Sequence, residues 1–589
     1  MATSSESTRR LRARRLDQPD GSVEMWFERT DQQVTWRRKG LRGSSTGNWD
    51  CCSEPNCLGE VIAGTEKCFA HLPESHRRRH LQGLVGTQRL LSLKGNVVTA
   101  SVVAPILEIA ESGKFDLWVS FAGAVVEAPI RFRGCRIGGS IDLGGAEFKD
   151  EVSFRTCEFV MGLNCQYASF QTAVFHQCRF ENILLLSYVE CRGNSVILTD
   201  CSLKKDVSAD GISAGLSANH CRFDGGLSIR YAKSASLVLD QSEIRGPFVV
   251  ERSSFVHVQA RSLQVIGSHR IGPLQVMGHC SLTESRFETR ADLQIDAKVL
   301  DLSGVQMPSG GRVIAGRGRI VLRRLTAGSN VTVAGRAENA STPEVVSLRA
   351  ADVGVMTFAH LDMRRCSFAG AHNLRAISLE STVSLASAPG NWRTRRRCIA
   401  DEFACRHSAS HSGAWLLPGT AMVGQVDDAR ILDESLPVEL PVPKFAEVAA
   451  LYRDLRRSAE SAGNEPGAAD FYYGEMEMRR HSDAEVPERA ILFAYWLLSG
   501  YGLRAWRSFV ALLAVLVMAV VIVHQWGFTS PNAPGPASSI LFVLRAVLWR
   551  TSEPPGLTTV GASTAVAMVL IAPALLAMGL LAVRARVKR

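Results

Sequence analysis

Four side chains near the amino terminus have the types and the spacing of a metal site. Four residues separate Cys52 from Cys57, two separate Cys68 from His71, and a loop of ten residues joins the pairs. Two close pairs of thiolate and imidazole ligands can surround one tetrahedral zinc ion. Because protein ligands fill all four positions, we expect a structural ion without a catalytic water. Cys51 remains an alternative to Cys52.

Two other groups of chemically capable residues are expected to be structural. The segment Cys398 to His411 contains two cysteines and two histidines, but their spacing fits no familiar metal site and predicts a mixed loop. Glu475 and Glu477 fall on different faces of a predicted helix, where neighbouring arginines offer ordinary ion pairs. The chain contains no Ser-His-Asp arrangement, P-loop or dinucleotide fingerprint. We therefore expect no enzymatic activity.

A short repeat dominates the middle of the chain. Large apolar residues recur every five or six residues, or about twice that, each with a small or β-branched residue two positions earlier. The strongest copies are Ala146-Glu-Phe148, Cys157-Glu-Phe159, Ala168-Ser-Phe170, Cys178-Arg-Phe180, Cys221-Arg-Phe223 and Cys366-Ser-Phe368. Such a period predicts a mainly β solenoid, with degenerate coils beyond about Phe255.

The cysteines support the same prediction. Cys135, Cys157, Cys178, Cys201 and Cys221 are separated by 22, 21, 23 and 20 residues, close to one turn of a coil. Each is expected to lie above the previous one as a buried free thiol that acts as a small hydrophobe. A ladder of disulfides or metal ligands is the alternative, which a reduced compartment disfavours.

A five-residue unit with this pattern resembles the pentapeptide-repeat family. The resemblance implies a right-handed parallel β-helix, in which four units make one square turn and stack their small and large residues inside. Some members are acidic mimics of DNA, but residues 101 to 385 carry 30 Lys and Arg against 28 Asp and Glu. That near-neutral balance excludes a strongly negative face.

The carboxyl-terminal part carries a second resemblance. The stretches Leu451-Tyr-Arg-Asp-Leu-Arg456 and Ala469-Asp-Phe-Tyr-Tyr-Gly-Glu-Met-Glu-Met-Arg-Arg480 are similar to the juxtamembrane part of actinobacterial pentapeptide-repeat membrane proteins. This resemblance covers roughly the last 150 residues. It implies a bacterial membrane protein whose repeat domain precedes a two-helix membrane segment.

A chain of 589 residues should divide into several domains. The predicted parts are a basic and partly disordered segment (1–45), a zinc module (46–92), the β-helix (97–390), a linker (391–443), a helical juxtamembrane region (444–505) and two transmembrane helices (506–526 and 562–583). Apolar positions spaced by three and four predict the first juxtamembrane helix around Phe445 to Leu455, and Asn464 to Gly467 breaks it from the second. The stretch Ile491 to Leu498 predicts a helix in the membrane interface.

Charge sets the expected orientation. The apolar runs of the two predicted transmembrane helices (506–526 and 562–583) each approach the roughly 20 residues that a helix needs to cross a bilayer. Arginines precede the first run and follow the second, whereas the connection contains only Arg545 and Arg550. The positive-inside rule therefore places both termini in the cytoplasm of a cell with an inner (plasma) membrane. A reduced cytoplasmic domain also agrees with 15 cysteines.

Two functions from different classes remain open. The first is a membrane-anchored cytoplasmic scaffold that presents the solenoid to a protein partner, with a homo-oligomer allowed by the family resemblance. The second is an ion channel or transport component, because Leu557-Thr-Thr-Val-Gly561 between the spans resembles part of a potassium-channel filter. Basic residues and tryptophans around the zinc module could contact nucleic acid or anionic lipid. A nucleic-acid partner is not expected, because acidic residues dilute that charge.

Overall fold

The computed structural model describes residues 9–18, 21–29, 33–40, 43–55, 57–193, 195–336, 342–389, 396–410, 415, 442–482, 486–529, 535–548 and 556–587. The chain divides into two compact units. The first contains residues 1–373 and 379–384, and the second contains residues 374–378 and 385–589.

The first unit begins with an antiparallel sheet of four strands in sequence order. The strands are β1 (Arg9–Gln18), β2 (Gly21–Arg29), β3 (Gln33–Gly40) and β4 (Gly43–Asp50). They occupy described residues of the segment 1–45, for which the sequence predicts partial disorder, and β4 extends into the predicted zinc module (46–92). Three helices follow, η1 (Phe69–His71), α1 (Glu74–Leu84) and α2 (Ala100–Ala110).

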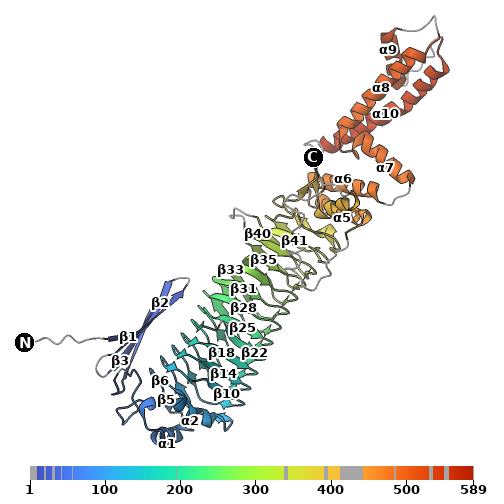
Figure 1. Cartoon of the computed structure of the whole chain (residues 1–589). Helices are drawn as coiled ribbons and strands as arrows, with labels where there is room; N and C mark the ends of the chain where they lie inside the picture. The colour runs from blue at the N-terminus through green and yellow to red at the C-terminus, as the bar shows by residue number, and fades with distance from the viewer. Residues whose placement is uncertain are drawn as a thin grey trace, which may run out of the picture. The chain divides into compact units, whose positions relative to one another are not determined.

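A parallel β-solenoid of about twelve turns makes up the rest of this unit, as Figure 1 shows. Partners in one ladder are Arg136, Glu158, Arg179, Ser202 and Arg222, so a turn takes between 20 and 23 residues. Each early turn contributes one short strand to each of four ladders. The predicted solenoid is thereby confirmed, including its period.

Two ladders form separate sheets. One contains β6 (Val97–Val98), β9 (Val125–Val126), β13 (Glu147–Phe148), β17 (Ser169–Phe170) and β21 (Glu190–Cys191). The other contains β7 (Lys114–Phe115), β11 (Arg136–Ile137), β15 (Glu158–Phe159), β19 (Arg179–Phe180), β23 (Ser202–Leu203), β26 (Arg222–Phe223), β29 (Glu243–Ile244), β32 (Gln264–Val265), β34 (Arg286–Phe287), β36 (Gln306–Met307) and β39 (Thr326–Ala327).

The other two ladders belong to one sheet of 23 strands. One ladder begins with β5 (Leu90–Ser92), β8 (Trp118–Ser120), β12 (Ile141–Asp142), β16 (Leu163–Asn164), β20 (Leu184–Leu185), β24 (Val207–Ser208), β27 (Leu227–Arg230) and β30 (Phe248–Glu251). The other begins with β10 (Ile130–Arg133), β14 (Glu151–Arg155), β18 (Thr172–His176), β22 (Ser195–Thr199), β25 (Gly215–Asn219), β28 (Lys233–Val238) and β31 (Ser253–Gln259).

The two ladders merge where the sequence repeat weakens. Both β30 and β31 pair with the long strand β33 (His269–Ser281), which pairs in turn with β35 (Ala291–Asp301). The remaining strands are β37 (Gly311–Ala315), β38 (Arg319–Val321), β40 (Val331–Gly335), β41 (Glu344–Ser347), β42 (Met356–Ala359) and β43 (Ser378–Leu379). The two walls separate again beyond β35, which pairs with both β37 and β38.

Stacked phenylalanines fill the early coils. Phe154 lies over Phe175 with ring centroids 5.3 Å apart, and Phe159 lies over Phe180 at 4.6 Å. All four rings are buried. The recurrent phenylalanine is therefore an inward position of each turn, and stacking adds to its area burial.

The cysteine ladder is also confirmed. Cys135, Cys157, Cys178, Cys201 and Cys221 are all buried, free, and placed just before successive strands of one ladder. Burial raises the pKa of Cys135 to about 11, so this thiol stays neutral. A residue with positive φ precedes several of these thiols, including Thr156 and Gln177, and turns the corner of the coil.

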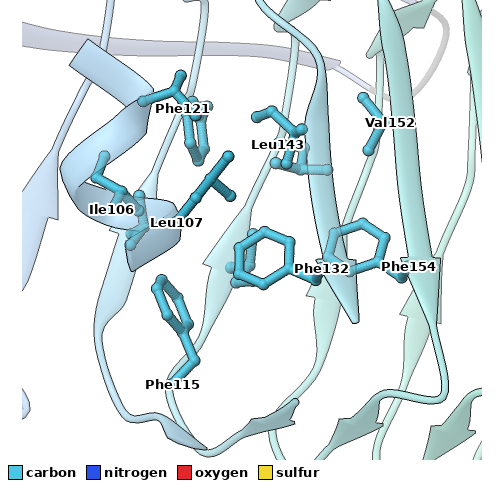
Figure 2. Close-up of a pocket in the computed structure, with 12 residues that line it drawn as sticks. Ile106, Leu107, Phe115, Phe121, Phe132, Leu143, Val152 and Phe154 are labelled. Carbon is cyan, nitrogen blue, oxygen red and sulfur yellow. The ribbon is translucent and has the colours of Figure 1, made fainter. Parts of the chain in front are cut away.

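Helix α2 closes the first coil, an element that the sequence prediction assigned to the solenoid. Its Ile106 and Leu107 face Phe115, Phe121 and Phe132 across the coil interior, as Figure 2 shows. The space between them has a volume of about 10 Å³ and an entirely apolar lining. A gap of this size and polarity is a packing defect of the core rather than a ligand site.

The second unit is mostly helical. Its elements are η2 (Leu374–Ala376), β44 (Ala386–Ser387), β45 (Arg397–Cys398), α3 (Ala400–Ser410), α5 (Phe445–Ser461), α6 (Glu465–His481), α7 (Val486–Ser499), α8 (Ala505–Trp526), α9 (Pro536–Val547) and α10 (Thr559–Val587). Helix α3 lies inside the segment 391–443, for which the sequence predicts a linker. In the same segment, residues 391–395, 411–414 and 416–441 lie outside the described residues.

The helix boundaries follow from capping. Asn464 accepts a hydrogen bond from the backbone N–H of Gly467 at 3.0 Å, so α6 begins at Glu465 and tolerates a proline in its first turn. Thr558 accepts a hydrogen bond from the N–H of Gly561 at 3.1 Å and caps α10 in the same way. Helix α10 therefore starts three residues before the predicted span 562–583.

Candidate metal centre

The backbone of the amino-terminal module brings four ligand-bearing residues together. Cys52 follows β4, and its N–H donates to the carbonyl of Gly59 at 2.9 Å. An antiparallel bridge joins Val61 to Cys68. Cys68 then precedes η1, at whose end the N–H of His71 donates to the Cys68 carbonyl at 3.1 Å. Cys52 and Cys68 thus flank one short extended segment, and the helical turn returns His71 toward both.

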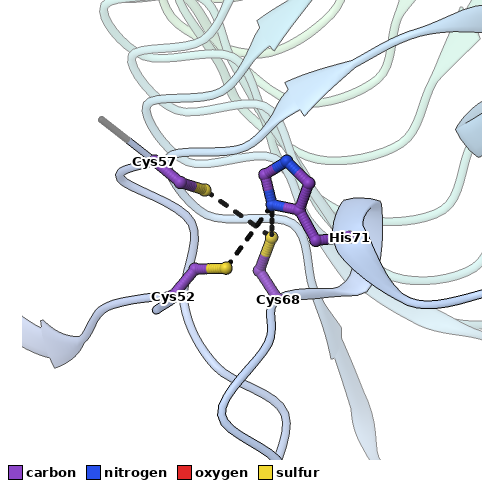
Figure 3. A group of neighbouring side chains, drawn as sticks. All are labelled: Cys52, Cys57, Cys68 and His71. Atoms are coloured by element: carbon purple, nitrogen blue, oxygen red, sulfur yellow. Dashed lines mark hydrogen bonds between the residues drawn. The ribbon is translucent and has the colours of Figure 1, made fainter. Parts of the chain in front are cut away.

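The donor atoms form a compact group, as Figure 3 shows. Nδ1 of His71 lies 3.4 Å from the sulfur of Cys52 and 3.3 Å from that of Cys68. The sulfurs of Cys57 and Cys68 are 3.7 Å apart, and all four donor atoms lie within 4.8 Å of one another. A tetrahedron with zinc–sulfur bonds of about 2.3 Å has sulfur–sulfur edges of about 3.8 Å, and sulfur–nitrogen edges of about 3.6 Å. The observed separations are close to those edges.

The environment of the cluster is graded from buried to exposed. Cys52 and Cys68 are fully buried, Cys57 is half-buried, and His71 is exposed. The backbone N–H of Gly59 donates to the sulfur of Cys57 at 3.3 Å. The hydrogen bond between the two sulfurs lowers the pKa of Cys57 and raises that of Cys68. A divalent cation bound by both thiolates would take the place of this hydrogen bond.

The structure distinguishes the two adjacent cysteines. Cys52 belongs to the cluster, whereas Cys51 packs with Trp49 and Leu58. Trp49 also donates its indole N–H to the Leu58 carbonyl at 2.8 Å. The four residues predicted from spacing are therefore the four that converge, and their donor set fits a closed tetrahedral metal.

The module rests on the first coil of the solenoid. The N–H of Glu60 donates to the carbonyl of Lys94 at 3.0 Å, and their side chains pair at 3.4 Å. Gly59 sits so close that an added Cβ would lie 2.8 Å from the Cβ of Cys68 and 2.3 Å from Oδ1 of Asn96. The backbone around the cluster is thus fixed by packing as well as by its own turns.

The second group of cysteines and histidines is not assembled. Within the described residues, Cys52, Cys57, Cys68 and His71 form the one group able to hold a metal ion. Cys398 and Cys405 are both buried, and His411 lies outside the described part. Burial raises the pKa of Cys405 to about 11, as expected of a neutral core thiol.

The two carboxylates of α6 are used in ion pairs. Glu475 binds Arg453 at 3.1 Å and Arg456 at 3.2 Å. Glu477 binds Arg480 at 3.0 Å, one of the two neighbouring arginines expected to pair. The expectation of a structural role agrees with these contacts.

A buried charge network, not foreseen from the sequence, joins four segments of the second unit. Glu402 of α3 is 0 % exposed and accepts hydrogen bonds from Arg396 at 2.6 and 2.7 Å. It also accepts from Arg406 at 2.8 Å and from the hydroxyl of Tyr452 at 2.6 Å. Arg406 continues to Glu477 at 3.1 Å. The only sequence signal is the run of arginines that ends at Arg397, which does not reveal the buried partners.

Comparison of the chain with protein-family models, with curated proteins and with solved structures gives no match. Function must therefore be argued from the residues themselves.

Proposed function

We propose that the chain is a membrane-anchored scaffold of the pentapeptide-repeat type, whose right-handed solenoid presents its surface to a protein partner. The observation that carries the proposal is the union, in one chain, of a parallel solenoid of about twelve turns with two long apolar helices. Stacked parallel strands expose extended regular faces, which suit binding better than catalysis. We propose no catalytic role.

Two helices support the anchor. Ala505–Trp526 and Thr559–Val583 are long and apolar enough to cross a membrane, with mean hydropathies of 2.5 and 2.6. They pack on each other through a cluster that includes Val523 and Met568. Large apolar side chains on their outer faces, such as Leu513 and Leu570, are exposed. An outer surface of this kind suits contact with lipid better than contact with water and so supports the proposed anchor.

The orientation is part of the proposal. Arginines border the two helices on the side of the chain termini, which places the solenoid and both ends in the cytoplasm at the inner (plasma) membrane. No disulfide joins any of the 15 cysteines in the described residues, which suits a reducing compartment. Cysteine labelling of intact cells tests the orientation, because a single cysteine introduced at Ser538 should react with an impermeant reagent and one at Ser101 should not.

The zinc assignment rests on donor geometry. We propose that Cys52, Cys57, Cys68 and His71 hold one structural zinc ion, which closes a small module that has few apolar residues. The test is the zinc content of purified full-length protein. Wild type should contain one zinc per chain, Cys57→Ser and Cys68→Ser should lose it, and Cys51→Ser should keep it. A metal-free wild-type protein with an intact module would refute the assignment.

We rank the channel alternative second because of where its filter-like segment lies. A potassium-type filter needs backbone carbonyls that face the ion, but Thr559, Val560 and Gly561 form the first turn of α10. The Val560 carbonyl accepts hydrogen bonds from Ser563 at 3.0 Å and Thr564 at 2.7 Å. A carbonyl used in this way does not replace ion hydration.

Two experiments separate the functions. Full-length protein in planar lipid bilayers should give no discrete currents, and currents that Gly561→Leu abolishes would establish the channel and overturn the scaffold. In cells, replacement of α8 to α10 by an unrelated two-span hairpin should preserve the set of proteins labelled by a proximity enzyme fused to the amino terminus. Loss of that set with correct insertion would show that the spans do more than anchor.

A further inference from the structure

Two arginines lie among aromatic rings where α7 meets α8. The guanidinium carbon of Arg504 is 5.0 Å from the ring centroid of Tyr473, and that of Arg507 is 5.1 Å from the ring of Trp496. Arg507 also donates to the backbone carbonyl of Trp496 at 3.1 Å. Both side chains are half-buried. The rings hold the two cations in place through their faces and leave the guanidinium hydrogen atoms largely uncommitted.

Neither cation has a carboxylate partner within ion-pair distance among the residues that the structure describes. Glu477 is the carboxylate whose charge acts on Arg504, but its oxygens are engaged elsewhere. They accept from Arg480 at 3.0 Å, from Tyr501 at 3.2 Å and from a further arginine of α3. The junction therefore carries two positive charges in excess of its described counter-charges.

Burial makes this excess unfavourable. Loss of hydration lowers the pKa of Arg504, and the nearby charge of Arg507 lowers it further. The opposite holds for Arg78 on α1, where hydrogen bonds and charges from Glu74 and Glu108 raise the pKa. The contrast shows what an anion would contribute at the junction, because a bound phosphate would supply the counter-charge that Arg504 lacks.

The surroundings indicate where such an anion would come from. Ile491, Leu497 and Trp506 are 69 %, 54 % and 51 % exposed, although two are large aliphatic residues and the third is a tryptophan. Ile491 and Leu497 belong to α7, and Trp506 lies between the two arginines in the first turn of α8. The uncharged run of α8 begins at Ser508, about 1.5 Å along the helix axis from Arg507. Tryptophan and arginine at the start of an apolar span are typical of the headgroup level of a bilayer.

We propose that Arg504 and Arg507 bind the phosphate of an anionic phospholipid headgroup, with the exposed apolar residues of α7 and Trp506 contacting the adjoining acyl chains. Guanidinium groups suit this role because their donors match phosphate oxygens in pairs. A free phosphate would leave the exposed apolar residues uncovered, so a lipid satisfies both features at once. The inference rests on the proposed membrane insertion of α8 and α10.

The test uses full-length protein in phosphatidylcholine nanodiscs that contain, at equal mole fraction, brominated phosphatidylglycerol or brominated phosphatidylcholine. Bromine quenches tryptophan fluorescence at short range, and the difference between wild type and Trp506→Phe isolates the signal of Trp506. Preference for the anionic lipid should be about fivefold for each arginine engaged. Arg504→Gln combined with Arg507→Gln should remove the preference, whereas lysine at both positions should retain part of it.

A matched control removes the same two charges elsewhere. Arg155 and Arg457 are exposed, form no ion pair among the described residues, and lie outside the junction. Their double replacement by glutamine should therefore leave the preference unchanged. Equal quenching of wild-type Trp506 by both lipids would overturn the headgroup site even if the arginine variants fail to fold. Failure of the wild-type chain to enter nanodiscs would overturn membrane insertion and the headgroup site together, so the two failures are distinguishable.

Discussion

Replacement of Glu402 by glutamine should destabilise the helices of the second unit strongly. The Glu402 carboxylate is the sole carboxylate bonded to Arg396 among the described residues, and Arg396 is itself 7 % exposed. Glutamine keeps the shape of the side chain but removes the negative charge. It also presents an amide N–H₂ group toward guanidinium donors, so at least one hydrogen bond becomes a donor–donor contact.

The magnitude follows from burial. Removing one partner of a buried ion pair costs about 3–5 kcal/mol, because the remaining charge loses its compensation. Arg406 keeps its second carboxylate, Glu477, so the cost arises mainly at Arg396. At about 1.4 kcal/mol per factor of ten, the population of opened α5 and α6 should rise between about a hundredfold and a few thousandfold.

Hydrogen exchange of full-length protein, read by mass spectrometry on peptides from α5 and α6, measures this change locally. A single unfolding curve would not, because the chain has more than one unit. Glu465→Gln is the matched control, because Glu465 is exposed in the first turn of α6. This replacement should change the population of opened α5 and α6 by no more than about fivefold. If Glu402→Gln increases the population of opened α5 and α6 by less than tenfold, Arg396 is not left as an uncompensated buried charge.

Three further perturbations follow from individual contacts. Gly474→Ala should destabilise α5 and α6 by about 1–3 kcal/mol in the same exchange measurement, because its Cβ would lie 2.8 Å from ring atoms of Tyr452; unchanged exchange would show that the ring moves freely. Phe175→Ala should cost about 3–5 kcal/mol in the solenoid, seen as faster exchange in neighbouring coils but not in α6. Burial alone would raise the pKa of Glu477, but the charges of Arg480 and of an arginine of α3 outweigh burial and hold this pKa below its ordinary value of 4.5. The stability that Glu477 contributes is therefore full above pH 4.5 and is lost as the pH falls below it. Hydrogen exchange of α6 measured over a series of acidic pH values checks this. The Glu477→Gln variant should lose less stability over the same pH range.

The elements that could be predicted are those whose signal is local in sequence. The stacking of Phe154 on Phe175 follows from a period of one turn, and the metal ligands follow from spacings of a few residues. Helix α2 is not predicted from the sequence, because its apolar residues lie inside the range 97–390 that is assigned to the solenoid. A closer reading of Thr558 as a helix cap would have placed Gly561 inside α10, since the bond between them spans three residues.

The charge network could not be predicted because its partners are far apart in the chain. Tyr452 reaches Glu402 across 50 residues, and Arg406 reaches Glu477 across 71. Each of these residues is an ordinary member of an amphipathic helix when taken alone. Only the packing of α3, α5 and α6 reveals that their charged faces meet inside the unit rather than in solvent.

The distribution of arginines connects these observations. On the solenoid, basic residues pair with acidic residues of the same or the next turn, as Arg131 does with Glu151 at 3.1 Å and Lys149 with Glu127 at 2.7 Å. Such exposed pairs add little stability and leave a nearly neutral surface. Near the two long apolar helices the balance differs. Glu477 is shared between α3, α6 and Tyr501, while Arg504 has no carboxylate in contact among the described residues. The same carboxylate thus ties Tyr501, just before α8, to the helices that precede it, and Arg504, which it does not contact, is one of the two arginines that we propose bind an anionic headgroup.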